Sequence, residues 1–212
     1  MNSHSGTDIT AVELLDGRVV SLRRLGGQDS DAVLALHKHL PDQDLYLRFF
    51  TMRPAHLELL AHQLTEINGT RCAVGAFDAD RLIGVTNYVV SSDDPQVAEV
   101  AIAVAHDDHR VGVGTALLEY LGEVAISRGI RRFTADVLAT NHLMLQVLSD
   151  AGWPRKRLSE NGHVLHFQIE LPRHPTSAIG IARRRVLADR KDKRVRHRPN
   201  SAQHKGRNSG GA

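Results

Sequence analysis

Gly112 and Gly114 mark the place where a short apolar stretch gives way to the pattern of a helix. Glycine has no β-carbon, so this turn can adopt backbone angles closed to other residues, and a bulky group can lie against its amides. Those amides open the helix, where unpaired N–H groups and the positive end of the helix dipole favour an anion such as a pyrophosphate. Because a glycine turn often does no more than begin a helix, the pattern alone leaves the anion-binding and the structural interpretations open.

This glycine turn differs from two common phosphate-binding loops. No Lys-Ser or Lys-Thr pair follows Gly114, although the loop of nucleoside triphosphatases requires one. A third glycine at the spacing of dinucleotide-binding folds is also missing. The sequence therefore excludes both of these nucleotide-binding motifs at this turn.

Glu99 lies in the apolar stretch ahead of the turn and is the best candidate for a general base, a group that removes a proton from a reactant. Successive side chains of a strand point to opposite faces, so Glu99 shares its face with small residues that leave room for a ligand and bury the carboxylate. A strand glutamate is commonly an ordinary surface residue, and the pattern alone leaves that interpretation open as well. The small face comprises Glu99, Ala101 and Ala103, and the bulky face Ala98, Val100, Ile102 and Val104.

A short run of potential metal ligands lies between the apolar stretch and the glycines. It consists of His106, Asp107, Asp108 and His109. These residues are consecutive in one turn, and the single cysteine, Cys72, adds no thiolate cluster. The sequence therefore predicts no metal site.

Hydrophobic periodicity indicates the elements that must position these residues. The stretch from Glu99 to Val104 is predicted to be a strand, and Thr115 to Arg128 a helix with apolar residues along one side. Strands that occur in runs, with helices interposed, predict a mixed sheet of the α+β class and not a doubly wound parallel sheet. Further strands are expected at 18–23, 71–77, 81–90, 132–138, 155–158 and 164–170, and further helices at 30–39, 45–50, 54–64 and from Asn141.

Charge divides the chain of 212 residues into two unequal parts. Residues 1–172 carry fifteen Lys and Arg against twenty-two Asp and Glu, whereas residues 173–212 carry twelve against two. We expect a flexible N-terminus over 1–12, one domain over 13–172, and a basic, disordered tail over 173–212. A basic cluster makes the tail a candidate for weak nucleic-acid binding, but the lack of interleaved aromatic residues favours a solvated extension.

Cysteine content and hydropathy indicate the cellular compartment in which the protein is expected. One cysteine rules out an internal disulfide, and the sequence shows neither a signal-like segment nor a long apolar run. We therefore expect a protein of the reducing cytoplasm that does not bind membranes.

Two motifs resemble signatures of the GNAT superfamily of N-acetyltransferases. The turn His-Arg-Val-Gly-Val-Gly over 109–114 is similar to its acyl-coenzyme A binding motif, although the usual first residue is Gln or Arg. The stretch 141–153, which opens with Asn and ends at Gly-Trp, resembles a second signature in which a helix opened by Asn ends at Gly-Phe. Within the superfamily, Leu45–Phe50 and Ala98–Ala101 are similar to segments of bacterial protein-lysine acetyltransferase domains, and the whole resemblance covers 19–171.

The resemblance implies a mostly antiparallel sheet flanked by helices, with acetyl-coenzyme A (acetyl-CoA) as cosubstrate. It implies that Glu99 is the catalytic residue, because related lysine acetyltransferase domains place a glutamate at the matching position. Strands of this family bulge and splay, so backbone N–H groups between Ala101 and Val104 are implied to stabilise the oxyanion. The implied cofactor-binding residues are Ile102, Ala103, Val104, His109, Arg110, Val111, Gly112, Val113, Gly114, Thr115 and Asn141.

The role of Asn141 and the identity of the proton donor have open interpretations. Asn141 either hydrogen-bonds the pantetheine arm of the cosubstrate or simply caps the helix that it opens. Many relatives carry a Tyr in place of Leu148, so the proton donor for the departing thiolate is left to solvent, the acceptor amine, Tyr88 or Tyr120. Arg48 is interpreted as structural.

The resemblance predicts an enzyme that moves an acetyl group from acetyl-CoA to a primary amine, either a protein lysine or a small molecule. The alternative is a catalytically silent acyl-CoA-binding module whose basic tail binds nucleic acid. Binding without turnover would distinguish this module from the enzyme.

Overall fold

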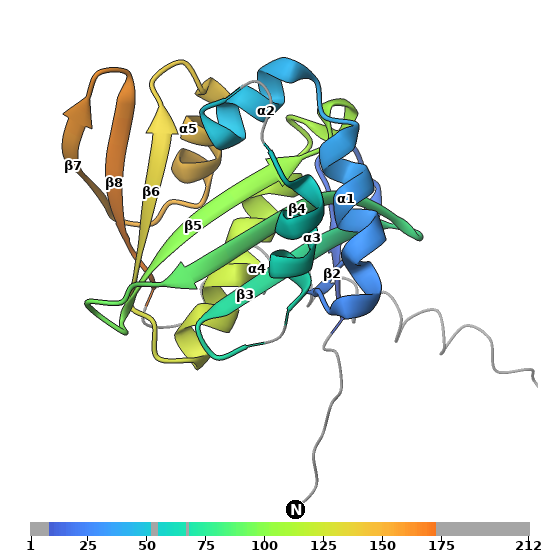
Figure 1. The fold of residues 1–212 in the computed structure, drawn as a ribbon, viewed down its shortest axis with the longest axis horizontal. Coiled ribbons are helices and arrows are strands. Elements are labelled where there is room, and N and C mark those ends of the chain that lie inside the picture. The colour runs from blue at the N-terminus through green and yellow to red at the C-terminus, as the bar shows by residue number, and fades with distance from the viewer. Residues whose placement is uncertain (1–8, 52–54, 67, 173–212) are drawn as a thin grey trace, which may run out of the picture.

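The structure, a computed structural model, describes residues 9–51, 55–66 and 68–172. Eight strands form one sheet in the order β1-β2-β3-β4-β5-β6-β8-β7, with helices on both faces (Figure 1). Every neighbouring pair of strands is antiparallel except β5 and β6, which run parallel. This arrangement confirms the predicted mixed, mostly antiparallel sheet flanked by helices.

Strands and helices follow one another much as the hydrophobic pattern predicts. The strands are β1 (Thr10–Glu13), β2 (Val19–Arg24), β3 (Arg71–Asp78), β4 (Arg81–Val90), β5 (Val97–Val104), β6 (Arg132–Leu138), β7 (Arg155–Asn161) and β8 (Val164–Glu170). The α-helices are α1 (Ser30–Lys38), α2 (Asp42–Phe49), α3 (Leu57–Thr65), α4 (Val113–Ser127) and α5 (His142–Asp150), and two short 3-10 turns are η1 (Gly27–Asp29) and η2 (His106–Asp108).

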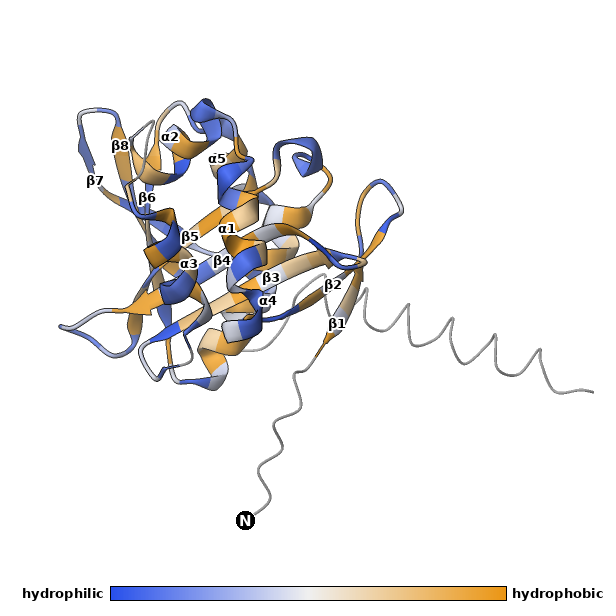
Figure 2. Cartoon of the chain, turned by 45° about the vertical axis from the view of Figure 1, so that its right-hand side comes forward, coloured by the Kyte–Doolittle hydropathy of each residue, from blue (hydrophilic) through white to orange (hydrophobic). Residues whose placement is uncertain are grey.

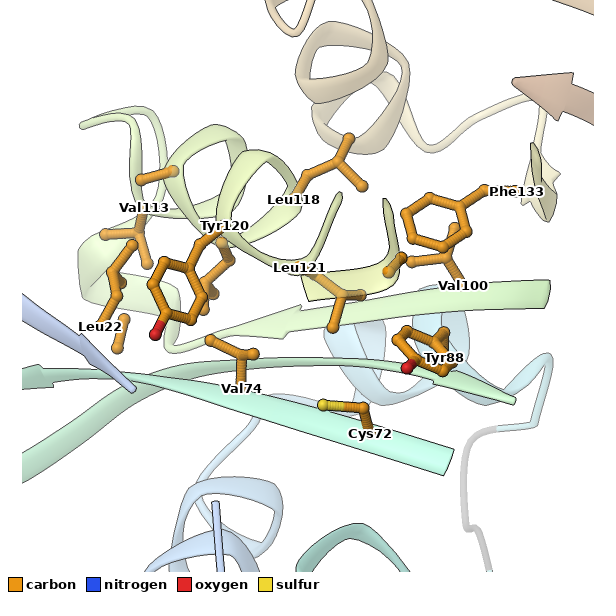
Figure 3. Close-up of a cluster of buried hydrophobic side chains, with 14 of the residues drawn as sticks. Leu22, Cys72, Val74, Tyr88, Val100, Val113, Leu118, Tyr120, Leu121 and Phe133 are labelled. Carbon is orange, nitrogen blue, oxygen red and sulfur yellow. The ribbon is translucent and has the colours of Figure 1, made fainter. Parts of the chain in front are cut away.

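Two hydrophobic cores lie on opposite faces of the sheet. In the larger core, α4 packs across the central strands and buries Leu117 and Leu121 completely. Figure 3 shows this core, with Leu121 of the helix beside Tyr88 and Val100 of the strands. The smaller core lies beneath α1 and α3 on the other face. Each fully buried large apolar side chain contributes about 1.5–3 kcal/mol, so the two cores hold the sheet between the helices.

The strand that carries Glu99 contributes to both cores, because its side chains alternate between the two faces. Val100 belongs to the core beneath α4, and Ile102 and Val104 pack against that core. Ala103 belongs to the core beneath α1 and α3. The structure therefore confirms the two faces predicted for this strand, with Glu99 on the face of α1 and α3.

β5 and β6 pair only where they begin. Val97–Glu99 lies beside Arg132–Thr134, whereas the rest of β6 is paired with β8 alone among the described strands. The two strands therefore diverge from Val100 onward and open a gap in the sheet. β5 keeps its pairing with β4 from Ala98 to Val104 without a register shift, so it splays as expected but does not bulge there.

Trp153 packs the C-terminal part of the described chain against α4. Trp153 follows α5 and packs against α4 at Gly122, where a β-carbon would overlap the indole ring. The same ring lies 6.5 Å from that of Phe133, measured between centroids. Beyond it, β7 forms an exposed and largely hydrophilic edge of the sheet, in contrast to the hydrophobic central strands (Figure 2).

β1 corrects the expected flexible N-terminus. Thr10, Ala11 and Val12 fall within the segment 1–12, yet they pair with β2, and Val12 is buried. So short an alternation of apolar and polar residues is not recognisable as a strand until its partner is placed. Residues 1–8 and the predicted tail lie outside the described residues, within which no helix has the length and apolar character that a membrane crossing needs.

Candidate functional site

A cavity of about 380 Å³ lies where β5 and β6 diverge, with α2 on one side and α5 on the other. Its lining follows β5 from Glu99 to Val104 and continues into the glycine turn, so it joins the candidate base to the candidate anion site. The predicted site residues that line it are Glu99, Ile102, Ala103, Val104, His109, Arg110, Gly112, Gly114, Thr115 and Asn141.

The glycine turn brings the start of α4 to this cavity. Arg110 and Gly112 both adopt left-handed backbone angles, with φ of 64° and 95°, and α4 then begins at Val113 without a side-chain cap. The first N–H groups of the helix have no partner within it, so they are available to an anion. Gly114 has a further reason to be glycine, because a β-carbon there would lie 2.8 Å from Cγ2 of Val147 in α5.

Two of the predicted cofactor-binding residues have side chains outside the cavity lining. Val113 is buried in the core beneath α4, and Val111 packs against that core. The carbonyl of Val111 also accepts a hydrogen bond of 3.0 Å from the N–H of Leu15. Their side chains face the core, so only their backbone can contribute to the site.

The edge of β5 also turns backbone groups toward the cavity. The N–H of Ala105 donates to the carbonyl of Ile83 in a 2.8 Å hydrogen bond, so the backbone groups of Ala105 point toward β4. Along a strand, the backbone groups of successive residues point alternately toward one neighbouring strand and the other. Backbone groups two residues apart point the same way, so those of Ile102 and Val104 point away from β4, into the gap beside β6. Their N–H groups can therefore stabilise negative charge on a bound molecule.

Glu99 lines the cavity but is exposed to solvent, which corrects the expectation that its neighbours bury it. Ala101 is half-buried, and only Ala103 lies within the core. Alternation along a strand identifies the face of a side chain but not its depth, because depth depends on what the other elements leave uncovered. An exposed carboxylate can exchange protons with water as well as with a bound amine.

The match to known proteins covers the same part of the chain. The profile of the acetyltransferase (GNAT) family matches residues 39–153, more than half of the sequence. This chain belongs to the GNAT family. The matched residues extend from the end of α1 to Trp153, so they include β5, the glycine turn and Asn141. Family and fold thus confirm the predicted enzyme class, an acetyltransferase.

Three solved structures share the GNAT fold. The GNAT domain of S. lividans PAT is 29% identical, with a TM-score of 0.69, over 77% of this chain and 97% of that one. A putative acetyltransferase from Salmonella typhimurium, solved with its cofactor acetyl-CoA, is 13% identical, with a TM-score of 0.57, over 73% and 95% of the two chains. A cAMP-binding acyltransferase from Mycobacterium smegmatis is 20% identical, with a TM-score of 0.58, over 91% of this chain but only 57% of that one.

The wall of the GNAT cavity also includes a positively charged side chain, Arg48, which the sequence did not place there. Arg48 of α2 lines the cavity, and its Nη2 donates to Oδ1 of Asn87 at 3.2 Å. Its Nε is buried without a hydrogen-bond partner among the described residues, and the guanidinium lies 4.8 Å from the centre of the Phe49 ring. Burial lowers the pKa of Arg48 to about 10, while the charge of Glu99 acts in the opposite direction. Arg48 therefore stacks internally, as expected, and also belongs to the wall of the site.

Asn141 caps α5 in this GNAT domain, as one of its two interpretations requires, and its position leaves the other open. Its Oδ1 accepts a 3.0 Å hydrogen bond from the N–H of Met144, which caps α5. The residue also lines the cavity. An amide has two donors in addition to the acceptor, so the side-chain nitrogen is available to a ligand while the oxygen caps the helix.

The structure excludes both tyrosines, Tyr88 and Tyr120, as direct proton donors to the departing thiolate. Tyr88 and Tyr120 are buried in the core beneath α4, as Figure 3 shows, and neither lines the cavity. Burial raises the pKa of Tyr88, and its hydroxyl accepts a 3.1 Å hydrogen bond from Nη1 of Arg128. Leu148, at the position where relatives carry Tyr, is buried as well.

Proposed function

We propose that this GNAT protein transfers an acetyl group from acetyl-CoA to a primary amine, with protein lysine as one acceptor class. One observation carries the proposal: a single cavity follows β5 from Glu99 to the glycine turn that opens α4. It joins a carboxylate, which can take a proton from an amine, to a helix N-terminus, which can bind a pyrophosphate. The two substrates can therefore meet along one strand.

The residues around the turn fit the cosubstrate. The first N–H groups of α4 face the pyrophosphate, because anions are favoured at the positive end of the helix dipole. Arg110 lines the same cavity and adds a positive charge. The gap between β5 and β6 accepts the pantetheine arm, to which Asn141 donates a hydrogen bond from its side-chain nitrogen.

The transfer forms a nitrogen–carbon bond and breaks the carbon–sulfur bond of the thioester. Glu99 takes a proton from the ammonium group of the acceptor, directly or through a water, and passes it to solvent. The free amine then attacks the thioester carbonyl, and the N–H of Ile102 or Val104 stabilises the charge that develops on the carbonyl oxygen. A second proton leaves the nitrogen and ends on the departing thiolate. Because neither tyrosine reaches the cavity, this proton travels through water or directly from the nitrogen.

The acceptor enters beside α2. Tyr46 and Phe50 are exposed on this helix and at its end, and Phe50 lines the cavity next to Arg48. Exposed aromatic side chains at the mouth of a site offer contact area to a partner larger than a small amine. This surface supports protein lysine as an acceptor, alongside small molecules.

An acceptor panel tests the proposal. Acetyl-CoA binding is measured by calorimetry, and release of free CoA thiol is followed with lysine-containing peptides, free amino acids and simple amines. We expect saturable binding and, with at least one amine, one CoA released for each amine acetylated. Binding without CoA release for any amine would instead identify a silent acyl-CoA-binding module, and no binding would show that the cavity serves another ligand.

A further inference from the structure

Three potential metal ligands from two separate segments converge at the wall of the cavity. Asp44 belongs to α2, whereas His106 and His109 belong to the turn between β5 and α4. One carboxylate oxygen and one nitrogen from each imidazole all lie within 4.8 Å of one another. Oδ2 of Asp44 is 3.0 Å from Nδ1 of His106 and 4.0 Å from Nε2 of His109. We propose that these three side chains bind a divalent transition-metal ion of the zinc type.

The donor set suits such an ion. Imidazole nitrogens and carboxylate oxygens bind Zn²⁺ at about 2.0–2.2 Å, and three protein ligands leave one position open to water. Ligand atoms around a tetrahedral ion are about 3.5 Å apart, so the widest separation in this group must close by about 1 Å. The exposed ring of His106 can make this movement. Nε2 of His109 lies 3.0 Å from the carbonyl of Val104, and the ion would replace this contact, because one nitrogen cannot donate a hydrogen and bind a metal at once.

The charge of Asp44 supports a bound cation. Its side chain is only 12% exposed, and its ion pairs among the described residues involve the two histidines alone. Among the described residues, the two aspartates that are fully buried, Asp29 and Asp108, are paired with arginines instead. A shared dication would balance the charge of a carboxylate that is partly withdrawn from water.

The position of the group indicates what bound metal would do. It connects α2, which forms the acceptor side of the cavity, to the turn that leads into the glycines. Asp44 and His109 line the cavity, whereas His106 does not. A metal ion would therefore tie two walls of the site together and restrict the entry of substrates. Glu99 is not among the ligands, so the ion would take no part in proton transfer, and we expect it to inhibit by restricting this entry.

A cobalt titration tests the binding directly. The full chain is prepared without a histidine tag, and Co²⁺ is added while its visible absorption is recorded in the absence of acetyl-CoA. We expect one Co²⁺ to bind per chain and to give intense visible absorption bands, as Co²⁺ does in a site of low symmetry. Zn²⁺ should displace the bound Co²⁺ and abolish these bands. D44N and H106A should each weaken binding at least tenfold, since even the loss of an orienting partner has that effect.

The matched control is H166A. His166 also pairs with a carboxylate, that of Asp136, but with no second imidazole, so its removal should leave the titration unchanged. Absence of saturable binding in the wild type would overturn the proposal. So would binding of Co²⁺ by D44N and H106A that is as tight as in the wild type. Since binding is recorded without acetyl-CoA, this result is independent of the proposed acetyl transfer.

A second readout follows the effect on turnover and rests on the proposed function. With an accepted amine, Zn²⁺ should lower turnover of the wild type and of H166A, while H106A keeps its basal rate and resists inhibition. His106 is suited to this comparison because it is 63% exposed and does not line the cavity. Equal inhibition of H106A and the wild type would place any inhibitory metal elsewhere.

Discussion

The side-chain oxygen of Asn141 accepts a hydrogen bond from the backbone N–H of Met144 at 3.0 Å, so one residue both caps α5 and lines the cavity. Two substitutions separate these functions. Asn141→Asp keeps the capping oxygen but loses both amide donors, whereas Asn141→Ala loses oxygen and donors together. We expect Asn141→Ala alone to lower the free energy of unfolding, by about 1 kcal/mol, the usual value of an N-cap.

Both Asn141 variants should bind acetyl-CoA more weakly, by about tenfold, which corresponds to one lost hydrogen bond. Urea unfolding measures the stability, and calorimetry measures the affinity. Unchanged affinity in a folded Asn141→Asp variant would mean that the amide contributes only the cap.

A second prediction concerns the contact between the glycine turn and α5. Gly114→Ala should destabilise the protein by about 1–3 kcal/mol, because the new methyl group would lie 2.8 Å from Cγ2 of Val147. Val147→Ala removes that atom, so the double variant should recover most of the loss. Chemical unfolding of the two single variants and the double variant gives the coupling energy, for which we expect about 1 kcal/mol or more. Gly69→Ala is the control, since a β-carbon there has no neighbour within 4 Å.

Strong local patterns predicted much of this fold from the sequence. β6 has the predicted ends, Arg132 and Leu138, because alternation and a preceding glycine mark the strand clearly. The two faces of β5 were also predicted correctly, since they depend only on the period of a strand. The glycine turn and Asn141 line one cavity, as the two motifs indicated.

Features that depend on distant partners could not be predicted in this way. The exposure of Glu99 depends on how far α2 extends over β5, and the gap beside Ile102 depends on β6 leaving β5 for β8. His106 and His109 formed no convincing metal site in the sequence. Their third partner, Asp44, lies 62 residues before His106 and is brought to it only by packing of α2.

A buried histidine predicts the pH dependence of stability. His37 of α1 is buried, and burial, together with the nearby charge of Arg48, lowers its pKa to about 4, although Nδ1 contacts the carbonyl of Val33 at 2.8 Å. In the unfolded chain the imidazole has a pKa of about 6.5, so between about pH 6.5 and 4 the unfolded state binds the additional proton. The free energy of unfolding should therefore fall as the pH drops through this window, by roughly 3 kcal/mol at most.

The comparison of two leucine variants tests this origin. His37→Leu removes the titrating group, and its stability should change much less between pH 6.5 and 4. His39→Leu, which removes an exposed imidazole just after the same helix, should retain the wild-type slope. Equal slopes for His37→Leu and the wild type would assign the acid sensitivity to other groups.

The basic tail predicted over 173–212 should be dispensable for folding and turnover. We expect a chain ending at Pro172 to melt within about 5 °C of the full chain, because a larger shift would correspond to a kcal/mol or more of lost packing. If the tail binds nucleic acid, only the full chain should show affinity that falls steeply with added salt. Thermal scans and salt titrations of both chains measure these two properties, and a large loss of melting temperature would show that the tail packs on the domain.

The proton acceptor is the central element of the proposed mechanism. Glu99→Gln keeps the shape of the side chain and removes its basic oxygen, whereas Glu160→Gln makes the same change at another exposed strand glutamate, outside the cavity. A positioned base typically contributes about 10²–10⁴ in rate, and a lysine amine, with a reference pKa of about 10.4, depends on such a group at neutral pH. Acetyl-CoA affinity should be nearly the same in both variants and the wild type.

The most direct measurement is therefore kcat of Glu99→Gln with an amine that the wild type demonstrably acetylates. We predict a fall of about 10²–10⁴-fold, with loss of the acidic limb of the pH–rate profile and with Glu160→Gln unaffected. Wild-type turnover by Glu99→Gln would show that this carboxylate is only part of the surface and that another group removes the proton.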